Sequence, residues 1–515
     1  MTPRPRLARL VSPLLRSPYS SVPSSIPRLP PLLSSLDHPS TSSPTNHLNG
    51  WIKTVRKSKN LSFAVLTDGT KVGGVQVVLP KGLEEGLTVG CSVGLKGEWV
   101  QSPKDSEKRE FKVNEVTWIG ESDAESYPIP NTKQGIPLPL LRHNAHLRTR
   151  KQDMCSVMNI RSEMNWAMSN YFRNEGFLKV EAPIITSSDC EGGGEVFKVI
   201  DATPPPPPPS SSPDVPPPPP PPSRYLSVSS QLHLEALASS HPRVYALSPC
   251  FRAEKSDTSR HLQEFWMLEA ELAFLDPSPR IALEQVMDVV EGSVRSIARH
   301  VREGKGVGED FEWLAGGKGG KQVGLRERVE GLLSEEERYV RMSYTDAVEV
   351  LKEVQEKDKE RFVYKVEWGL GLQTEHEKYL AEEYVKGPLF VTDYPTKLKP
   401  FYMLRNEPTS TTSKKKEEDH SRETTSCFDL LVPQLGELAG GSLRTHSQSD
   451  LLKAIEENGN MRKEDYDWYL DLRKFGTTRH GGFGLGWERL VGFLTGMGNV
   501  RDCIAFPRAG EGSRF

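Results

Sequence analysis

The stretch RVYALSPCFRAEKSDTSRHLQEFWMLEAEL, residues 243–272, decides the fold. An apolar run from Val244 to Leu247 leads into a polar loop, and an alternating apolar run from 266 to 272 follows. This pattern predicts a long antiparallel β-hairpin. The ionisable residues that flank its loop are Arg252, Glu254, His261 and Glu264. Paired cations at the end of a sheet suit phosphate oxygens, because Arg presents a fixed fork of donors. The alternative is a charged hairpin in a purely structural sheet.

The pattern FRAE, loop, RHLQEF resembles motif 2 of the class II aminoacyl-tRNA synthetases. Residues 176–197, GFLKVEAPIITSSDCEGGGEVF, are similar to motif 1, a helix followed by a strand, with Pro183 at the subunit interface. Residues 481–496, GGFGLGWERLVGFLTG, resemble motif 3, a Gly-rich strand that enters a helix with Arg489 in its first turn. The resemblance implies an α+β catalytic domain, built on an antiparallel sheet flanked by helices, and a homodimer.

Length and composition set the outer limits. A chain of 515 residues can form two or three domains with substantial cores. Six cysteines without a CxxC pair indicate neither a zinc site nor a disulfide framework. No run approaches the roughly 18 apolar residues that a membrane-spanning helix needs, so we expect no membrane partner. The net charge of -3 leaves nucleic-acid binding to local basic patches.

Residues 1–45 contain five Arg, no Lys and a single acidic residue, Asp37, among many Ser and Pro. The segment RPRLARLVSPLLRS within it is compatible with a short amphipathic helix. This composition is typical of a mitochondrial transit peptide, and it predicts a disordered leader and a location in the mitochondrial matrix. A basic tail without a targeting role is the alternative.

Residues 46–120 consist of short alternating runs separated by turn signals, which predicts an all-β barrel of five strands. The runs are LNGWIKTVRKS (48–58), LSFAVLTDGT (61–70), GGVQVVLP (73–80), LTVGCSVGLKGEWV (87–100) and EFKVNEVTWIG (110–120). This range resembles the N-terminal anticodon-binding OB-fold of the aspartyl, asparaginyl and lysyl synthetases.

A basic cluster at 53–59 lies close to Phe63. The combination suits a single-stranded target, because cations follow phosphates while an aromatic face stacks an unpaired base. The resemblance implies that Phe63 stacks on the central anticodon uridine and that Arg56 and Gln76 contact it. The alternative for Phe63 is burial inside the barrel.

The remainder of the chain is predicted to be a hinge followed by the catalytic domain. Residues 121–150 are Pro-rich and end in AHLRTR, which resembles the hinge of this subgroup. A helix should follow and stop at Gly176, since apolar residues recur at helical spacing. The catalytic domain is expected over 151–515, with three inserts. The inserts are a Pro-rich surface segment at 203–223, a lobe with a short helix at 304–337, and a disordered segment at 409–426.

Activation of an amino acid is an attack by its carboxylate on the α-phosphate of ATP. The protein must hold two anions in line and needs no nucleophile of its own. The resemblance assigns Arg252 to the α-phosphate and the substrate carboxylate, and His261 and Arg489 to the γ-phosphate. Phe265 and Arg489 would enclose the adenine, with Glu254 near its exocyclic edge or the terminal adenosine of tRNA.

Two acids in residues 427–444, Asp429 and Glu437, lie on apolar strands. Hard oxygen ligands of this kind suit Mg²⁺ that bridges phosphates. The matching pair in aspartyl enzymes is one residue closer together, so a strand-end carboxylate is the alternative for Asp429. The glycines at 481–486 favour close approach of the backbone to a ligand.

The substrate side chain is predicted to be that of asparagine. The resemblance assigns Glu191 and Gln231 to the substrate α-ammonium and Arg444 to its side-chain oxygen. Where aspartyl enzymes carry a Lys, three residues after that Gln, this chain has Leu234. Where they carry Asp in the second strand of motif 2, it has Glu269, which can accept an amide N–H.

Strand alternation places Glu269 on the same face as Phe265, so it should point into the site beside Arg444. A site that lacks the cation of the aspartyl enzymes and keeps an acid repels the negatively charged side chain of aspartate. The strings SSQLHLEA, RHLQEFWMLEAEL and VTDYPTKLKPFYMLRNE also resemble asparaginyl-tRNA synthetases, organellar ones especially.

The sequence therefore predicts a homodimeric synthetase that uses ATP and Mg²⁺ to join L-asparagine to tRNA(Asn). One alternative is an aspartyl or non-discriminating synthetase, which Leu234 and Glu269 oppose. A second is an inactive tRNA-binding paralogue, which the presence of Arg252, Arg489 and Glu437 opposes. A third is a free-standing asparagine-forming ligase, which would not need the barrel.

Overall fold

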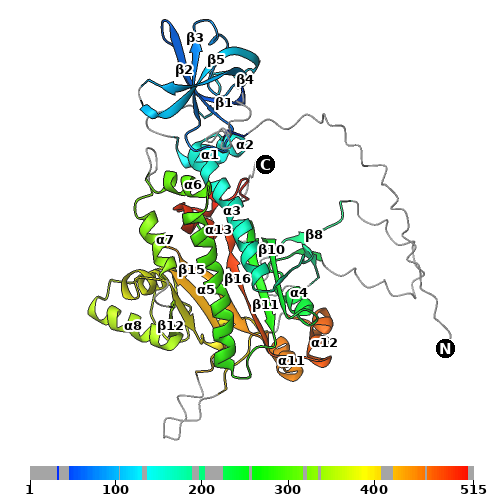
Figure 1. The fold of residues 1–515 in the computed structure, drawn as a ribbon. Helices are drawn as coiled ribbons and strands as arrows, with labels where there is room; N and C mark the ends of the chain where they lie inside the picture. The colour runs from blue at the N-terminus through cyan, green and yellow to red at the C-terminus, as the bar shows by residue number, and fades with distance from the viewer. Residues whose placement is uncertain are drawn as a thin grey trace, which may run out of the picture. The chain divides into compact units, whose positions relative to one another are not determined.

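The chain divides into two compact units, residues 1–127 and 128–515, and each is described by itself. The structure is a computed structural model, drawn as a ribbon in Figure 1. It describes residues 32–33, 46–103, 105–129, 136–187, 196–202, 224–253, 258–316, 322–334, 338–407, 422–458 and 461–508. Across those ranges, every helix is too short or too polar to cross a bilayer.

The first unit contains a closed five-stranded barrel in the order β1-β2-β3-β5-β4, as the alternating runs predicted. Its strands are β1 His47–Arg56, β2 Leu61–Thr67, β3 Val75–Pro80, β4 Ser92–Ser102 and β5 Asp105–Gly120. Alternate side chains point inward, and Leu66, Val77 and Phe111 among them are fully buried. The other face of each strand is left for solvent and for ligands.

Leu33 adds a side chain to the barrel core from within the predicted leader. Its side chain is 1% exposed, and its backbone N–H donates to a carboxylate oxygen of Asp68 at 2.8 Å. The prediction of disorder throughout 1–45 is therefore wrong at Leu33. The physical reason is that an isolated apolar side chain gains by leaving water, whatever the composition of its neighbours.

The second unit is built on an eight-stranded sheet in the order β12-β13-β14-β15-β16-β11-β10-β6. Neighbouring strands are antiparallel, except that β12 with β13 and β10 with β6 are parallel pairs. The strands are β6 Leu178–Lys179, β10 Arg243–Phe251, β11 Glu264–Ala273, β12 Val340–Ser343, β13 Leu389–Thr392, β14 Cys427–Val432, β15 Gly436–Leu443 and β16 His480–Gly486. A small second sheet consists of β7 Ile185–Thr186, β9 Arg224–Leu226 and β8 Lys198–Val199 in that order.

Helices cover the large sheet, which confirms the predicted α+β architecture. The α-helices are α1 Leu138–His143, α2 Ala145–Arg148, α3 Gln152–Asn174, α4 Gln231–Ala238, α5 Pro279–Glu303, α6 Val307–Leu314, α7 Leu325–Leu333, α8 Tyr344–Lys357, α9 Thr374–Lys378, α11 Gln448–Glu457, α12 Asp467–Lys474 and α13 Trp487–Thr495. Short helical turns are η2 Tyr379–Tyr384, η3 Thr396–Leu398, η4 Lys463–Tyr466 and η5 Val500–Asp502. Helices α1 and α2 lie within the predicted hinge.

The hairpin 243–272 is the centre of this unit. Strands β10 and β11 pair without interruption from Arg243 opposite Leu272 to Phe251 opposite Glu264, as the sequence predicted. Leu268 and Ala270 of β11 pack in the core formed with α3 and α5, two long helices that cross the sheet in Figure 1. Alternation therefore turns the odd-numbered residues of β11 to the opposite face, where the candidate site lies.

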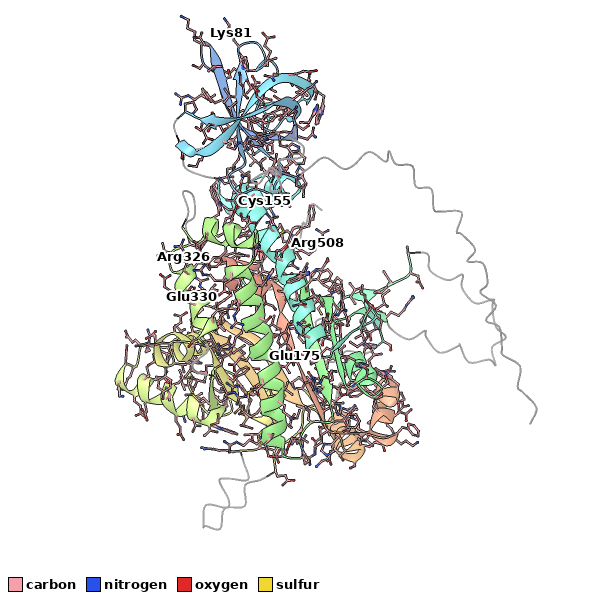
Figure 2. All side chains as sticks on the ribbon, viewed as in Figure 1. Lys81, Cys155, Glu175, Arg326, Glu330 and Arg508 are labelled. Atoms are coloured by element: carbon pink, nitrogen blue, oxygen red, sulfur yellow. The ribbon has the colours of Figure 1, made fainter. Side chains whose placement is uncertain are left out.

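The three predicted inserts have different outcomes. The range 304–337 holds two short helices, α6 and α7, rather than one. Arg326 and Glu330 project from the exposed face of α7 (Figure 2), and they form ion pairs with Glu312 and Arg302 respectively. Residues 422–426 were predicted to be disordered, yet Thr424 pairs with Pro395 and Thr425 with Arg405. The range 203–223 lies outside the described residues.

Candidate active site

A pocket lies on the site face of the sheet, where β11, β15, β16 and the start of α13 meet. The residues that line it are Arg252, Arg260, His261, Leu262, Phe265, Met267, Glu437, Leu438, Gly484, Gly486, Glu488, Arg489 and Val500. Arg252 and Arg489 are far apart in the sequence, and the structure brings them to this one pocket as predicted. Three arginines and the ring of Phe265 are among the groups around this cavity, and they suit a nucleotide polyphosphate.

Arg252 lies at the end of β10, and its backbone N–H donates to the carbonyl of Gln263 at 3.0 Å. Its guanidinium lies 5.5 Å from the centroid of the Phe265 ring. The ring nitrogen Nδ1 of His261 lies 2.5 Å from the hydroxyl of Thr258. These contacts place three predicted ATP ligands at the end of the hairpin. Glu254, the fourth hairpin residue predicted there, lies outside the described residues.

Arg489 is in the first turn of α13, as motif 3 predicts, and it contacts Glu437. Its Nη1 donates to the Glu437 carbonyl at 3.0 Å and to the Glu437 carboxylate at 3.3 Å. Glu488 holds the helix start in place, because it accepts the backbone N–H of Trp266 at 2.9 Å and pairs with Arg161 at 2.7 Å. Arg489 is thereby fixed relative to β11 and β15.

Arg260 is a pocket cation that the sequence reasoning missed. Its Nη1 donates to the hydroxyl of Thr374 at 2.7 Å and lies 4.0 Å from Glu377. Its buried Nη2 has no hydrogen-bond partner among the described residues. Burial, followed by the charge of Arg489, lowers the pKa of Arg260. A buried cation that faces another cation is stabilised by a bound anion, which fits a phosphate group.

Three carboxylates gather beside this pocket. Asp429 and Glu437 both flank Gly440, whose Cβ, if present, would lie 3.1 Å and 3.7 Å from their oxygens. The register of β14 with β15 shifts by one residue after Leu430, so the extra residue between the two acids forms a β-bulge. The longer spacing therefore does not separate the predicted acidic pair.

Both oxygens of Asp429 accept hydrogen bonds from the ammonium of Lys399, at 2.8 and 2.9 Å, an ion pair that the sequence did not indicate. The third acid, Glu377 of α9, was also missed, and its Oε2 accepts the backbone N–H of Glu437 at 3.2 Å. Burial, and then the charge of Glu437, raises the pKa of Glu377 to about 7. Burial opposes ionisation of Glu437, but Arg489 and Lys399 lower its pKa below the ordinary value.

The residues predicted to bind the amino acid lie on the same face of the sheet. Glu269 is 3% exposed and accepts hydrogen bonds from the hydroxyl of Ser229 and, at 2.9 Å, from the backbone N–H of Ser230. Gln231 donates to Glu235 at 3.2 Å. Glu191 lies outside the described residues.

Arg444 pairs with Glu271, an acid to which the sequence reasoning gave no role. Arg444 donates through Nε and Nη2 to the two oxygens of Glu271, at 3.2 and 2.9 Å. Glu271 lies opposite Gly482, and a Cβ there would come within 2.1 Å of the Glu271 carboxylate. Because Gly482 has no side chain, Glu271 has the space to reach Arg444. Strand alternation alone does not predict this contact, because Glu269 and Glu271 lie on the same face of β11.

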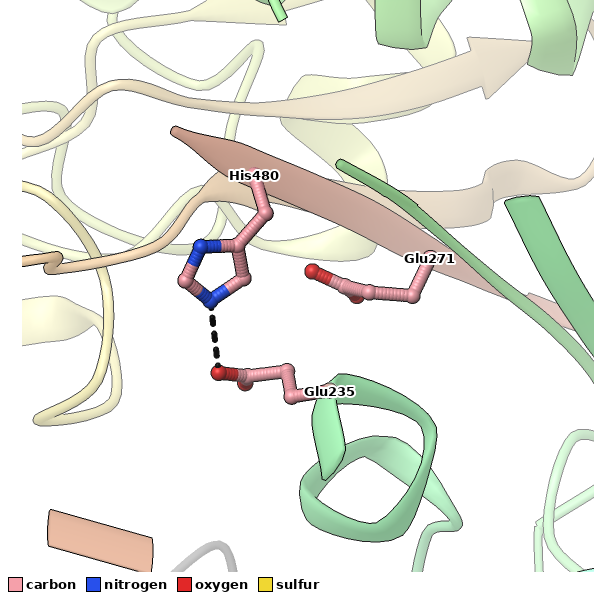
Figure 3. Close-up of side chains that lie close together, drawn as sticks. All are labelled: Glu235, Glu271 and His480. Carbon is pink, nitrogen blue, oxygen red and sulfur yellow. Dashed lines mark hydrogen bonds and ion pairs between the residues drawn. The ribbon is translucent and has the colours of Figure 1, made fainter. Parts of the chain in front are cut away.

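Behind Arg444 lies a buried polar cluster that the sequence reasoning did not find. Figure 3 shows Glu235, Glu271 and His480 facing one another, with the His480 ring hydrogen-bonded to Glu235 at 3.0 Å. Arg473 also pairs with Glu235, at 2.7 Å. The available signal was a glutamate inside the apolar helix segment QLHLEALA. Its charged partners Arg473 and His480 are more than 200 residues away, and no local pattern identifies them.

On the barrel, Phe63 faces outward and is 36% exposed, so burial inside the barrel is excluded. In the register of the strands it lies between Arg56 of β1 and Val78 of β3. Gln76 is exposed on the neighbouring rung, opposite Val65, and donates to Glu110 at 3.2 Å. The three residues predicted to contact the anticodon therefore share one outer surface of β1, β2 and β3.

Comparison with known families agrees with this geometry. Residues 139–510 match the family described as tRNA synthetases class II (D, K and N). Residues 47–119 match the OB-fold nucleic acid binding domain. The fold and the site thus define a class II tRNA synthetase.

Individual relatives narrow the assignment. The chain is 38% identical to Asparagine–tRNA ligase of Nostoc sp., over 91% of this chain and 96% of the relative. It is 39% identical to the protein of the same name from Clostridium novyi, over 91% and 95%. The solved asparaginyl-tRNA synthetase of Pyrococcus horikoshii, complexed with asparaginyl-adenylate, has a TM-score of 0.73 at 29% identity and covers 90% of this chain and 95% of that chain. Within its class, the chain belongs to the asparaginyl-tRNA synthetase family.

Proposed function

We propose that this protein activates L-asparagine with ATP to asparaginyl-AMP and transfers the asparaginyl group to the 3′ end of tRNA(Asn). The observation that carries the proposal is the pocket shared by Arg252 and Arg489, together with a buried Arg444 on the continuation of β15, whose residues Glu437 and Leu438 line that pocket. Several relatives with near-complete coverage carry the name Asparagine–tRNA ligase, which supports the choice of amino acid.

In the first step, the asparagine carboxylate attacks the α-phosphorus and pyrophosphate leaves. Arg252 is placed to hold the α-phosphate and the carboxylate together, which removes the entropic cost of orienting two anions. Arg260 and Arg489 supply positive charge to the departing pyrophosphate, and His261 lines the same pocket as a hydrogen-bonding group. In the second step, the 3′-hydroxyl of the terminal adenosine attacks the asparaginyl carbonyl and AMP leaves.

The acids beside the pocket fit a divalent cation. Asp429 and Glu437 border Gly440, and Glu377 borders Gly436, where the missing side chains leave space. Oxygen ligands of this kind suit Mg²⁺, which when bound there would neutralise phosphate charge. Glu437 and Glu377 are the better-placed ligands, because Asp429 already accepts two hydrogen bonds from Lys399.

Pyrophosphate exchange with ATP tests the proposed function directly. Purified protein should catalyse the exchange with asparagine and not with aspartate, and tRNA(Asn) should then accept labelled asparagine. Equal exchange rates with both amino acids would contradict the selectivity. Exchange without transfer to tRNA would contradict the second step.

We propose that the functional form is a homodimer assembled through the motif 1 region. Strand β6 is an edge of the large sheet, and an unpaired edge strand is a natural site for association. Leu178 in β6 is 46% exposed, and Ile184 and Ile185 nearby are 45% and 51% exposed. Apolar side chains clustered at an open edge suit burial against a second copy.

We also propose that the protein acts in mitochondrial translation in the matrix, with a leader that is removed upstream of Leu33. The arginine-rich and acid-poor composition of residues 1–45 supports import. The burial of Leu33 in the barrel favours a cut before it. N-terminal sequencing of the protein purified from mitochondria tests this, and an intact cytosolic protein would contradict it.

A further inference from the structure

Glu235 is a buried carboxylate placed between two predicted substrate contacts. It lies on α4, and its side chain is 0% exposed. Its Oε1 accepts a hydrogen bond from the amide of Gln231 at 3.2 Å and lies 3.8 Å from Nε of Arg444. Gln231 is assigned to the substrate ammonium and Arg444 to the substrate side chain. One oxygen of Glu235 therefore contacts both groups, and Arg444 is also hydrogen-bonded by Glu271 and Ser442.

The other oxygen, Oε2, anchors Glu235 from behind. Arg473 donates to it at 2.7 Å, and the His480 ring nitrogen Nε2 lies 3.0 Å from it. Arg473 is itself fixed, because its Nε donates to the carbonyl of Thr445 at 2.9 Å. Burial opposes ionisation, but the charges of Arg473 and His480 lower the pKa of Glu235 below the ordinary value, so the group stays a carboxylate at neutral pH. A carboxylate held this way is a rigid support for Arg444.

The positive charges of this cluster are balanced by its own acids, so none is left to pair with a substrate carboxylate. Two acids belong to the cluster, Glu235 and Glu271, and Glu269 lies two residues from Glu271 on the same face of β11; all three are nearly fully buried. Arg444 and Arg473 provide two cations, and His480 at most a third. The guanidinium of Arg444 is already paired with Glu271, so it offers its remaining hydrogen-bonding capacity to a neutral oxygen. A second substrate carboxylate would enter a buried region without a counter-charge, which is costly.

We propose that Glu235 is a positioning and specificity-determining residue that selects the substrate amide over a carboxylate. It does so by holding Arg444 and Gln231 in place and by cancelling positive charge that would otherwise attract aspartate. This inference rests on the proposed function, and it adds a residue next to Leu234, where the sequence showed only the absence of a cation. Removal of the Glu235 charge should therefore change which amino acid is activated, and not merely how well the protein folds.

The test is pyrophosphate exchange with asparagine and with aspartate on the wild type and on Glu235→Gln. The ratio of kcat/KM for asparagine to kcat/KM for aspartate should fall at least tenfold in the variant. KM for asparagine should rise more than kcat falls, because Arg444 holds a part of the substrate that does not react. Adding Arg473→Gln to Glu235→Gln removes one cation and restores the charge balance, so the ratio should return toward the wild-type value.

Glu291→Gln is the matched control, since Glu291 is a buried acid of α5 that is paired with Arg295 at 2.9 Å and Arg341 at 3.0 Å. It should keep the wild-type ratio even if it loses stability. A folded Glu235→Gln that keeps the wild-type ratio overturns the inference. If that variant does not fold, the double variant decides: selection of asparagine supports the inference, and use of aspartate overturns it. A wild type that activates no asparagine would instead overturn the proposed function.

Discussion

Glu377 is a buried acid in a site that has to bind polyphosphate, and its protonation affects stability near neutral pH. Burial and the charge of Glu437 raise its pKa from 4.5 to about 7 in the folded protein. Between these values the folded protein binds a proton that the unfolded chain releases. The stability associated with Glu377 is therefore fully present below pH 4.5 and is lost as the pH rises through 7.

Replacement of Glu377 by Gln should remove this pH dependence. In metal-free protein, the variant should exceed the wild type in free energy of unfolding by about 2 to 3 kcal/mol at pH 8. The difference should disappear near pH 4.5, and urea unfolding across this range measures it. Gln at the exposed position Glu353 is the control, and it should run parallel to the wild type. A Glu377→Gln curve parallel to the wild type would contradict the raised pKa.

The sequence identified the residues of the site that belong to local motifs and missed those that do not. Arg252, His261 and Phe265 fall in one hairpin, so their common location follows from a single pattern. Glu377 and Arg473 reach the site from elements that no motif connects to it. The pairing of Arg444 with Glu271 was not predicted, because two glutamates share one strand face and the space that lets Glu271 reach Arg444 is left by a glycine of another strand.

At the scale of elements, the glycines of β16 have two different functions. Gly484 and Gly486 line the nucleotide pocket, as the sequence suggested for the whole run. Gly482 instead faces the neighbouring strand, where a Cβ would lie 2.1 Å from the Glu271 carboxylate and 2.2 Å from the carbonyl of Ala270. A backbone carbonyl in a sheet cannot move aside without breaking strand pairing.

Gly482→Ala should therefore destabilise the protein by about 1 to 3 kcal/mol, or prevent folding, because of overpacking. It should also weaken asparagine binding, since Glu271 is displaced from Arg444. Gly484→Ala on the same strand is the control, because its Cβ would come closest to the flexible side chain of Met267, at 3.1 Å, and would make only an ordinary contact with Glu269, at 3.8 Å. Thermal unfolding measures both variants, and equal loss of stability would contradict the distinction between the two glycines.

Alternating and helical patterns predicted the barrel strands, the hairpin and the first turn of α13. Each of these elements either pairs with its neighbour in the sequence or repeats apolar residues at a regular spacing. The β-bulge after Leu430 and the small sheet of β7, β8 and β9 were not predicted. The bulge comes from one extra residue in β15 of the β14–β15 hairpin, whereas the small sheet depends on pairing between short segments that are far apart in the sequence. The burial of Leu33 was missed for the same reason, since its partners begin at residue 48.

At the scale of the whole molecule, we expect the two units to divide the proposed reaction. Asparagine activation should need only the second unit, whereas tRNA selection should also need the barrel. Phe63→Ala should lower the rate of tRNA charging by about tenfold or more, because a stacked base contributes about 1 to 3 kcal/mol. Pyrophosphate exchange should stay unchanged. Trp118→Ala removes another exposed aromatic of the barrel and is the control. Loss of both activities in Phe63→Ala would contradict a role confined to tRNA.

The proposed dimer would explain why apolar residues are exposed next to an open sheet edge. It can be tested by a charge placed among them. Ile184→Asp places a charge among Leu178, Ile184 and Ile185, and burial of that charge in an interface would be costly. Light scattering after gel filtration should show a dimeric wild type and a monomeric variant at micromolar concentration, with unchanged circular dichroism. Val363→Asp, at a residue 87% exposed elsewhere in the same unit, should remain dimeric. A monomeric wild type, or a dimeric Ile184→Asp protein, would show that this edge is not the interface.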